Sequence, residues 1–283
     1  MKKSAGLLSI VLAGIMVLSG CGASNDTGNN GETSNVKISI VGSTSVQPLA
    51  EDFAESYANV KQGAKVDVQG VGSSAGIKAA IDGTCDIGTS SRDLKEDEKS
   101  KGIVEHKIAV DGIGVVVNPK NQVGELTQEQ VVKIFKGEIT NWKDVGGADQ
   151  EIIVVSREEG SGTRSAFEEI LKLQEERDGK TYSLLANDAL IAEGNGAVKS
   201  NIASKEAAIG YLSIGVMDSS VKGIKLDGAE PTEDNVVNGS YKLSRPFLMV
   251  TKGEATGDTK DFIDWILSDD GQKIVTEAGF IAV

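Results

Sequence analysis

Short apolar runs alternate with amphipathic stretches along the chain from residue 36 onward. The first five predicted elements are a strand, a helix, a strand, a helix and a strand, at residues 36–42, 46–60, 65–72, 75–83 and 85–90. In the first predicted helix, Leu49, Phe53 and Tyr57 share one face, and Gly83 ends the second, as glycine commonly does. Strands and helices in this order indicate an α/β protein.

The middle and the end of the chain continue this pattern between two long apolar strands, at 112–119 and 244–253. Thr127 and Gln130 have the spacing of a capping box and open a predicted helical stretch. Residues 126–147 are predicted to be helical. A strand is predicted at 151–158 and a helix at 163–174. A helix followed by a strand is predicted within 203–214, and two helices are predicted at 258–268 and 269–279. We expect the chain to leave a first domain at one apolar strand and to return at the other, which gives two lobes with a cleft between them.

The first twenty residues do not fit a folded core. Lys2 and Lys3 precede an apolar run that is shorter than the ~20 residues a spanning helix needs, so residues 1–20 are predicted to be a signal peptide. The run ends in "LSGC", which resembles a bacterial lipobox, and Cys21 is then the expected site of acylation, with palmitate as the lipid. An ordinary secretory signal is the alternative. Residues 21–35, rich in Gly, Ser, Asn and Thr, are predicted to be a flexible tether.

The charge balance of the chain argues against nucleic acid as a partner. Without the two lysines of the signal peptide, 27 basic residues face 42 acidic ones, a net charge of −15. A small anion as ligand is still compatible with this charge, because a local positive field outweighs distant carboxylates that salt screens within ~10 Å.

Cys85 has no partner for an internal disulfide once Cys21 is acylated, and we expect it to be a small core residue.

Three turns share one composition, in which a strand end leads through small hydroxyl residues into a helix. They lie at residues 42–48, 70–76 and 158–164. The first turn of a helix presents free N–H groups and the positive end of the helix dipole, so such turns bind anions. Arg157 precedes the third turn, and its planar guanidinium suits a tetrahedral oxyanion. Glu159 is expected to orient this arginine.

Motifs of enzymes and metal sites are incomplete in this sequence. "GSSAG" at 72–76 satisfies the pattern of a serine-hydrolase nucleophile with Ser74, but the single histidine, His106, follows only thirty-two residues later in a polar context. Residue 174 is Gln where a Walker A motif begins with Gly, and one histidine with one spare cysteine does not make an ordinary zinc site. We therefore expect no enzyme activity, no cofactor and no metal, with an ester-cleaving enzyme as the rival class.

Several stretches together resemble the phosphate-binding lipoproteins of bacterial high-affinity phosphate ABC transporters. They include "GSTSVQPLAEDF", "GVGSSAGIKAAIDGTCDIGTSSRDL", "LTQEQVVKIFKGEITNWKDVGG", "SREEGSGTRSAF" and "SDDGQKIVTEAGFIAV". The resemblance implies the two-lobed type II periplasmic-binding-protein fold, with lobe 1 formed by 36–115 and 245–283 and lobe 2 by 116–244. It also implies a set of phosphate-binding residues, namely Thr44, Ser45, Ser73, Ser91, Arg157, Ser161, Gly162 and Thr163, with Glu159 behind the arginine.

One position departs from the family pattern. Ser91 stands where the family has an aspartate, and Arg92 and Asp93 follow it. A carboxylate accepts the proton of phosphate and repels sulfate, whereas a serine hydroxyl tolerates either ion. Rejection of sulfate would then depend on Asp93, on another acceptor or on pocket geometry.

The resemblance implies a monomeric, lipid-anchored protein on the extracytoplasmic face of the cell membrane. Such a protein captures inorganic phosphate and delivers it to the permease subunits of an ABC transporter. Two alternatives share the fold: a protein that binds sulfate, molybdate or another oxyanion, and a phosphate sensor or adhesion lipoprotein that does not take part in transport.

Overall fold

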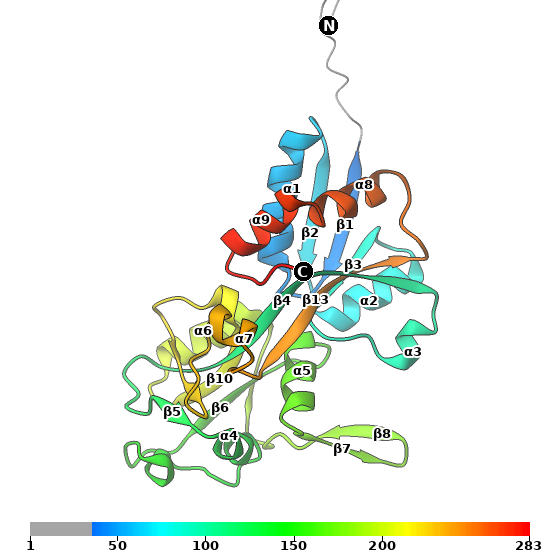
Figure 1. Cartoon of the computed structure of the whole chain (residues 1–283). Coiled ribbons are helices and arrows are strands. Elements are labelled where there is room, and N and C mark those ends of the chain that lie inside the picture. Colours follow the sequence, from blue (N-terminus) through cyan, green and yellow to red (C-terminus); the bar gives the residue numbers. More distant parts are fainter. Residues whose placement is uncertain (1–35) are drawn as a thin grey trace, which may run out of the picture. The chain divides into compact units, whose positions relative to one another are not determined.

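The computed structural model describes residues 36–283 (Figure 1). The predicted signal peptide, Cys21 and the tether lie outside the described residues and stay predictions. Within 36–283, no helix combines the length and the apolar character that crossing a membrane requires.

Nine strands form one mixed sheet that runs through both halves of the molecule. The strand order is β2-β1-β3-β13-β4-β10-β6-β9, with β11 paired to β4. The strands are β1 (Lys37–Gly42), β2 (Lys65–Gly70), β3 (Ile87–Ser90), β4 (Ile103–Val117), β6 (Ile153–Arg157), β9 (Leu190–Ala192), β10 (Ala208–Ser213), β11 (Lys222–Gly223) and β13 (Ser244–Lys252). Two short sheets lie apart from it and pair β5 (Glu125–Leu126) with β12 (Lys225–Leu226) and β7 (Gln174–Arg177) with β8 (Lys180–Ser183).

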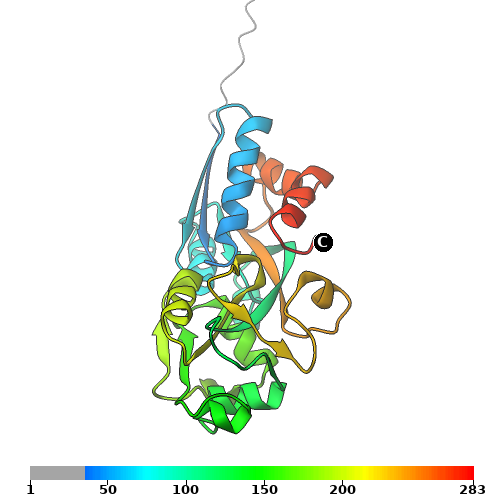
Figure 2. The ribbon, with the colours of Figure 1, turned by 90° about the vertical axis from the view of Figure 1, so that its left-hand side faces the viewer.

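The first lobe consists of β1, β2, β3 and the helices that pack on them. These helices are α1 (Gln47–Val60), α2 (Ser73–Asp82), α3 (Glu96–Lys99), α8 (Gly257–Ile266) and α9 (Asp269–Glu277). Phe53 and Tyr57 of α1 are buried, and their rings meet Trp265 of α8 with centroids 6.2 and 5.2 Å apart. The C-terminal helices therefore pack against the first helix of the fold, as Figure 2 shows for α1 and the red segments.

The second lobe consists of β6, β9, β10 and the helices around them. These helices are α4 (Gln128–Phe135), α5 (Gly162–Ile170), α6 (Gly194–Ser204) and α7 (Glu233–Val237), with short 3-10 helices at Trp142–Val145 and Ile214–Val216. Phe167 and Tyr211 stack with centroids 3.9 Å apart, and Phe135 contacts both rings. Full burial of such a side chain contributes roughly 1.5–3 kcal/mol, so this cluster fixes α5 against the sheet.

Strands β4 and β13 join the two lobes. They run antiparallel from the pair Ser244 and Gly112 to the pair Lys252 and Ile103. Along β4, Ala109 packs in the core of the first lobe and Ile113 in the core of the second. The predicted two-lobed α/β fold is thus confirmed, with two crossing strands between the lobes. The exact lobe boundaries stay a prediction.

Three predicted elements differ from the structure. The helical stretch over 126–147 is shorter, because α4 ends at Phe135 and Gly137 follows with φ of 74°. The helix expected within 203–214 lies earlier, as α6. Cys85 precedes β3 and is partly exposed, although it still packs beside a small apolar cluster, and burial raises its pKa to about 11.

Candidate ligand-binding site

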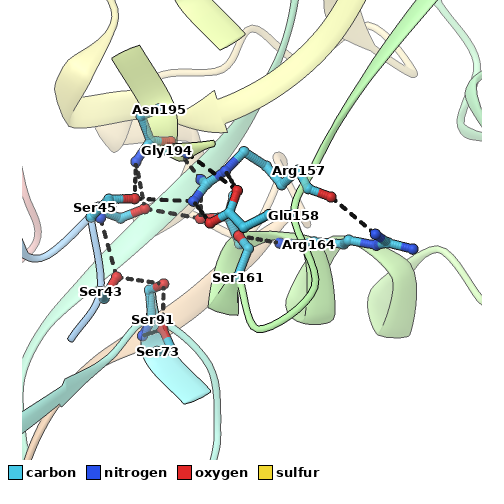
Figure 3. A network of polar contacts seen from close by, with 12 residues as sticks. Ser43, Ser45, Ser73, Ser91, Arg157, Glu158, Ser161, Arg164, Gly194 and Asn195 are labelled. Atoms are coloured by element: carbon cyan, nitrogen blue, oxygen red, sulfur yellow. Dashed lines mark hydrogen bonds and ion pairs between the residues drawn. The ribbon is translucent and has the colours of Figure 1, made fainter. Parts of the chain in front are cut away.

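The three glycine-rich turns of the sequence meet at the junction of the two lobes (Figure 3). The hydroxyl oxygen of Ser45, at the start of α1, lies 2.9 Å from that of Thr163 in α5. The backbone N–H of Ser74, in α2, donates to the carbonyl oxygen of Gly160 at 3.1 Å. The turns that precede α1, α2 and α5 therefore face a common point, as the sequence predicts for the carboxyl ends of strands.

The hydroxyl groups at this point are buried. Ser45, Ser73, Ser91, Ser161 and Thr163 are each 2% exposed or less. Gly162 is also buried, and Thr44 is half-buried. The structure thus gathers all eight predicted phosphate-binding residues, including Arg157, in one region between the lobes. Their contact with a ligand stays a prediction.

Arg157 is the predicted cation of this region and is 1% exposed. It ends β6, and its Nη2 donates to the hydroxyl oxygen of Thr44 in the opposite lobe at 3.0 Å. Its backbone N–H and the hydroxyl of Ser156 both approach the hydroxyl of Tyr211, at 3.4 and 2.8 Å. Because Tyr211 is stacked in the aromatic core of the second lobe, the packing of that core holds the arginine in place.

The acid that orients Arg157 is Glu158, and the prediction of Glu159 is wrong. Both carboxylate oxygens of Glu158 accept from the guanidinium, from Nη2 at 2.7 Å and from Nε at 2.8 Å. Glu158 also accepts the backbone N–H of Gly194 at 3.2 Å. Glu159 is exposed. The chain leaves the extended conformation after Arg157, so the alternation of a strand no longer decides which acid faces back toward the arginine.

Burial alone would raise the pKa of Glu158, but the hydrogen bonds and charge of Arg157 outweigh it and lower the pKa below its usual value. The carboxylate is therefore ionised near neutral pH. A bidentate pair of this kind fixes the plane of the guanidinium and leaves Nη1 and one N–H of Nη2 for other acceptors.

Gly162 allows the two lobes to approach closely. A Cβ atom at this position would lie 2.3 Å from the hydroxyl oxygen of Ser73 and 2.7 Å from that of Ser91. A Cβ atom essentially never lies within 3.0 Å of such an atom, so a side chain here would hold the lobes apart. Glycine at the first position of α5 brings its backbone N–H groups up to the hydroxyls of the first lobe.

The helices that begin at the site differ from the others in charge. Among the helices of the described chain, α1, α2, α5 and α6 have no acidic residue in the first turn, whereas α3, α4, α7, α8 and α9 each have at least one. Acidic residues there neutralise the positive end of the helix dipole. The ends of α1, α2 and α5 therefore keep a positive potential, which suits an anion. The N-terminus of α6 is instead met by a carboxylate, because Glu158 accepts the backbone N–H of Gly194.

Besides Glu158, two residues of the site were not predicted from the sequence. Asn195 is the second residue of α6, and its Nδ2 donates to the hydroxyl oxygen of Ser45 at 2.9 Å. It belongs to "EGNGAV", a fourth glycine-rich turn before a helix, which has the same composition as the other three. Ser43 donates through its hydroxyl to that of Ser91 at 2.8 Å.

The surroundings of Ser91 contain hydroxyls rather than a carboxylate. Its backbone N–H donates to the hydroxyl oxygen of Ser73 at 3.1 Å, and Ser43 lies on its other side. Asp93 is exposed. Arg92 turns away into a bidentate pair with Glu98, at 2.8 Å for both bonds. Asp93 therefore does not take the place of the family aspartate.

The residues considered for hydrolysis or metal binding are engaged elsewhere. The hydroxyl oxygen of Ser74 accepts from Arg92 at 3.3 Å, and Nε2 of His106 contacts Thr251 at 3.1 Å. Neither contact joins the serine to the histidine. Within 36–283, no three acidic, histidine or cysteine side chains are grouped so that they could hold a metal ion.

Comparisons with known proteins agree with this geometry. A family model described as a PBP superfamily domain matches residues 27–270. The phosphate-binding protein PstS of Bacillus subtilis is 34% identical over 295 aligned positions, which cover 100% of this chain and 95% of the relative. PstS of Borreliella burgdorferi is 30% identical and covers 87% of this chain.

Solved structures show the same likeness. A substrate-binding protein assigned to a phosphate ABC transporter of Clostridium perfringens, crystallised with bound phosphate, is 46% identical with a TM-score of 0.82 and covers 87% of this chain and 99% of its own. An ABC-type phosphate transport receptor of Vibrio cholerae is 42% identical, with a TM-score of 0.73 over 87% of this chain and 100% of its own. The chain is therefore a two-lobed solute-binding protein of the PBP superfamily. Within that superfamily it belongs to the family of the PstS phosphate-binding proteins.

Proposed function

We propose that this protein captures inorganic phosphate between its two lobes and delivers it to the permease subunits of an ABC transporter. The observation that carries the proposal is the meeting of buried hydroxyls, the N-termini of α1, α2 and α5, and Arg157 at one point between the lobes. Each donor type favours an oxyanion. The relatives named for phosphate binding, and the neighbour crystallised with phosphate, support phosphate as that ion.

The proposed ligand shell takes donors from both lobes. Thr44, Ser45, Ser73 and Ser91 belong to the first lobe, and Arg157, Ser161, Gly162 and Thr163 belong to the second. Closure completes the shell and excludes water, which strengthens each charge-assisted hydrogen bond. A ligand that binds the closed form alone shifts the opening equilibrium by its differential affinity. No bond of the ligand is made or broken, so we propose a binding protein rather than an enzyme.

The proposal places the protein on the extracytoplasmic face of the cell membrane, held by a lipid on Cys21. The sequence of residues 1–21 supports this placement, since an apolar segment of signal-peptide length ends in a lipobox-like cysteine. Labelling with a fatty-acid analogue tests it: wild type is expected to incorporate the label, and Cys21→Ala is not. Incorporation by both would contradict the anchor.

A second candidate is a protein of the same fold that binds another oxyanion such as sulfate or molybdate. The observation that favours it is Ser91, which is surrounded by hydroxyls and can serve either a protonated or a fully ionised anion. Thermal unfolding in the presence of a panel of tetrahedral anions separates the two candidates. Phosphate at about a hundred times its dissociation constant is expected to add ~2.7 kcal/mol of stability. An equal shift with sulfate would remove specificity for phosphate.

A further inference from the structure

Two charged residues, Asp111 and Arg245, are buried beside the candidate site, at facing positions on the crossing strands β4 and β13. Nη2 and Nε of Arg245 donate to one carboxylate oxygen of Asp111 at 2.8 and 3.2 Å, and both side chains are 1% exposed. The other carboxylate oxygen accepts from the hydroxyl of Ser213 at 2.9 Å. Asp111 is thus turned toward the second lobe.

The guanidinium of Arg245 is connected to the ligand-binding region through Ser45. Its Nη2 donates to the hydroxyl oxygen of Ser45 at 3.2 Å. The same oxygen receives Asn195 and lies beside Thr163. Arg245, the positive residue of the pair, therefore lies next to the ligand-binding region, and Asp111, the negative residue, lies behind Arg245.

One nitrogen of this guanidinium, Nη1, is buried and has no hydrogen-bond partner among the described residues. A buried donor without a partner costs free energy, and native proteins rarely tolerate it without a reason. An anion in the adjacent site would not give Nη1 a hydrogen bond, but it would interact favourably with the charge of the whole guanidinium, because Ser45 links the two.

We propose that Arg245 is a positioning residue that gives the site a second fixed positive charge, acts through Ser45, and makes the cleft prefer doubly charged phosphate to singly charged phosphate. This inference rests on the proposed function. It also explains how a site with Ser91 in place of a carboxylate retains a preference among phosphate species. The preference comes from an added cation rather than from an acceptor for the phosphate proton.

A dependence of phosphate affinity on pH also reflects the other titratable groups around this pair. The titratable groups that face it are Arg157 on β6, Tyr211 on β10 and Glu233 on α7. Burial raises the pKa of Tyr211 to about 12, so its hydroxyl is neutral, and a guanidinium stays protonated in proteins. Burial raises the pKa of Asp111, and its bonds to Arg245 oppose that shift. Burial also raises the pKa of Glu233. The effect of Arg245 on phosphate affinity is therefore separated from that of Asp111 by replacing each residue in turn.

The test is calorimetric titration of the full-length protein with inorganic phosphate at two pH values, one where the monoanion predominates and one where the dianion does. The measured quantity is the ratio of the two affinities. Wild type is expected to favour the dianion. In Arg245→Gln the ratio is expected to fall by about tenfold, the effect of one partly screened charge at short range. In Asp111→Asn, which leaves Arg245 uncompensated, the ratio is expected to stay or to rise.

A fall of the ratio in Arg245→Gln without a fall in Asp111→Asn distinguishes a charge effect from loss of a structural ion pair, which would lower the ratio in both variants. An unchanged ratio in Arg245→Gln, or a fall of the ratio in both variants, would overturn the inference. Arg245→Lys keeps the charge and is expected to restore the ratio. If Arg245→Gln does not fold, Ser45→Ala removes the hydroxyl that links Arg245 to the site and is expected to lower the ratio; an unchanged ratio there also counts against the inference.

Arg92→Gln serves as the matched control. Arg92 is another buried arginine in a bidentate acid pair, and its Nε also has no partner among the described residues. Its replacement is expected to lower the melting temperature and to leave the affinity ratio unchanged. If the wild-type protein binds no phosphate at either pH, both the proposed function and this inference are overturned. If the wild-type protein binds phosphate but Arg245→Gln has the same affinity ratio as wild type, only this inference is overturned.

Discussion

The hydroxyl oxygens of Ser45 and Thr163 lie 2.9 Å apart, although 118 positions separate the two residues in the chain. Each stands at the start of a helix, α1 in the first lobe and α5 in the second. The contact exists because the sheet passes through both lobes and brings the carboxyl ends of β1 and β6 to one place. It therefore reports on the closed arrangement of the lobes.

Replacement of Glu158 tests how Arg157 is oriented. Glu158→Gln removes the charge that holds the guanidinium by two bonds, and a charge-assisted hydrogen bond contributes roughly 1.5–3 kcal/mol. We expect phosphate affinity to fall at least tenfold, measured by calorimetry. Glu159→Gln is the matched control, because Glu159 is the adjacent acid and is exposed. An equal loss of affinity in the two variants would mean that phosphate binding depends on the general negative charge of the loop and not on the bonds between Glu158 and Arg157.

Replacement of Gly162 tests whether close approach of the lobes is needed. In Gly162→Ala the added methyl group would lie 2.3 Å from the hydroxyl oxygen of Ser73 and 2.7 Å from that of Ser91, so the lobes must move apart. The variant is expected to fold, to bind phosphate at least a hundredfold more weakly and to remain open. Small-angle scattering with and without phosphate measures the closure. Gly124→Ala is the control, because nothing lies within 4 Å of a Cβ atom there. Normal binding and closure in Gly162→Ala would contradict the closed arrangement.

Introduction of a carboxylate tests the role of position 91. Ser91→Asp places an acceptor where the resemblance implies one, so protonated phosphate can donate to it while sulfate, which has no proton, is repelled. We expect the ratio of phosphate to sulfate affinity to rise at least tenfold relative to wild type, in competition binding assays. A ratio that stays the same would show that position 91 does not contact the anion.

The pair of Arg92 and Glu98 gives the fold a dependence on pH. Burial raises the pKa of Glu98, but the bonds from Arg92 and from the backbone of Lys95 outweigh it and lower the pKa below its usual value. A group whose pKa is lower in the folded state stabilises it above the unfolded pKa and loses that contribution as the pH falls through the folded value. Wild type is therefore expected to lose stability in the acid range.

Urea unfolding at several acidic pH values measures this dependence. Glu98→Gln is expected to be less stable than wild type at neutral pH and to show a smaller decrease in unfolding free energy on acidification. The two proteins should converge at low pH. Parallel curves over the whole range would assign the acid sensitivity to other carboxylates.

Much of the fold could be predicted because its signals are local. The capping box of Thr127 and Gln130 forms as its spacing predicts, with bonds at 2.8 and 3.1 Å. The glycine-rich turns likewise mark the starts of α1, α2 and α5. The first half of β4 was not predicted. It contains exposed polar residues such as Glu105 and Lys107 and lacks the continuous apolar run of the second half.

The parts of the site that could not be predicted depend on tertiary contacts. The choice between Glu158 and Glu159 is decided by how the chain turns after β6, which no local pattern specifies. Asp111 and Arg245 become partners only through the register of β4 and β13. A signal was nevertheless present, because each charge directly precedes a continuous apolar run, at 112–117 and at 246–250, and a buried charge requires a partner.

Calorimetric titration of ligand-free wild type and of Arg157→Ala with inorganic phosphate tests whether the anion binds at the junction of the lobes. We expect saturable binding of one phosphate per wild-type chain. In Arg157→Ala we expect a loss of roughly 3–5 kcal/mol of binding free energy, because the bound anion would then be buried without its compensating charge. Binding of equal strength in the two proteins would contradict this expectation and would place the anion away from the junction of the lobes.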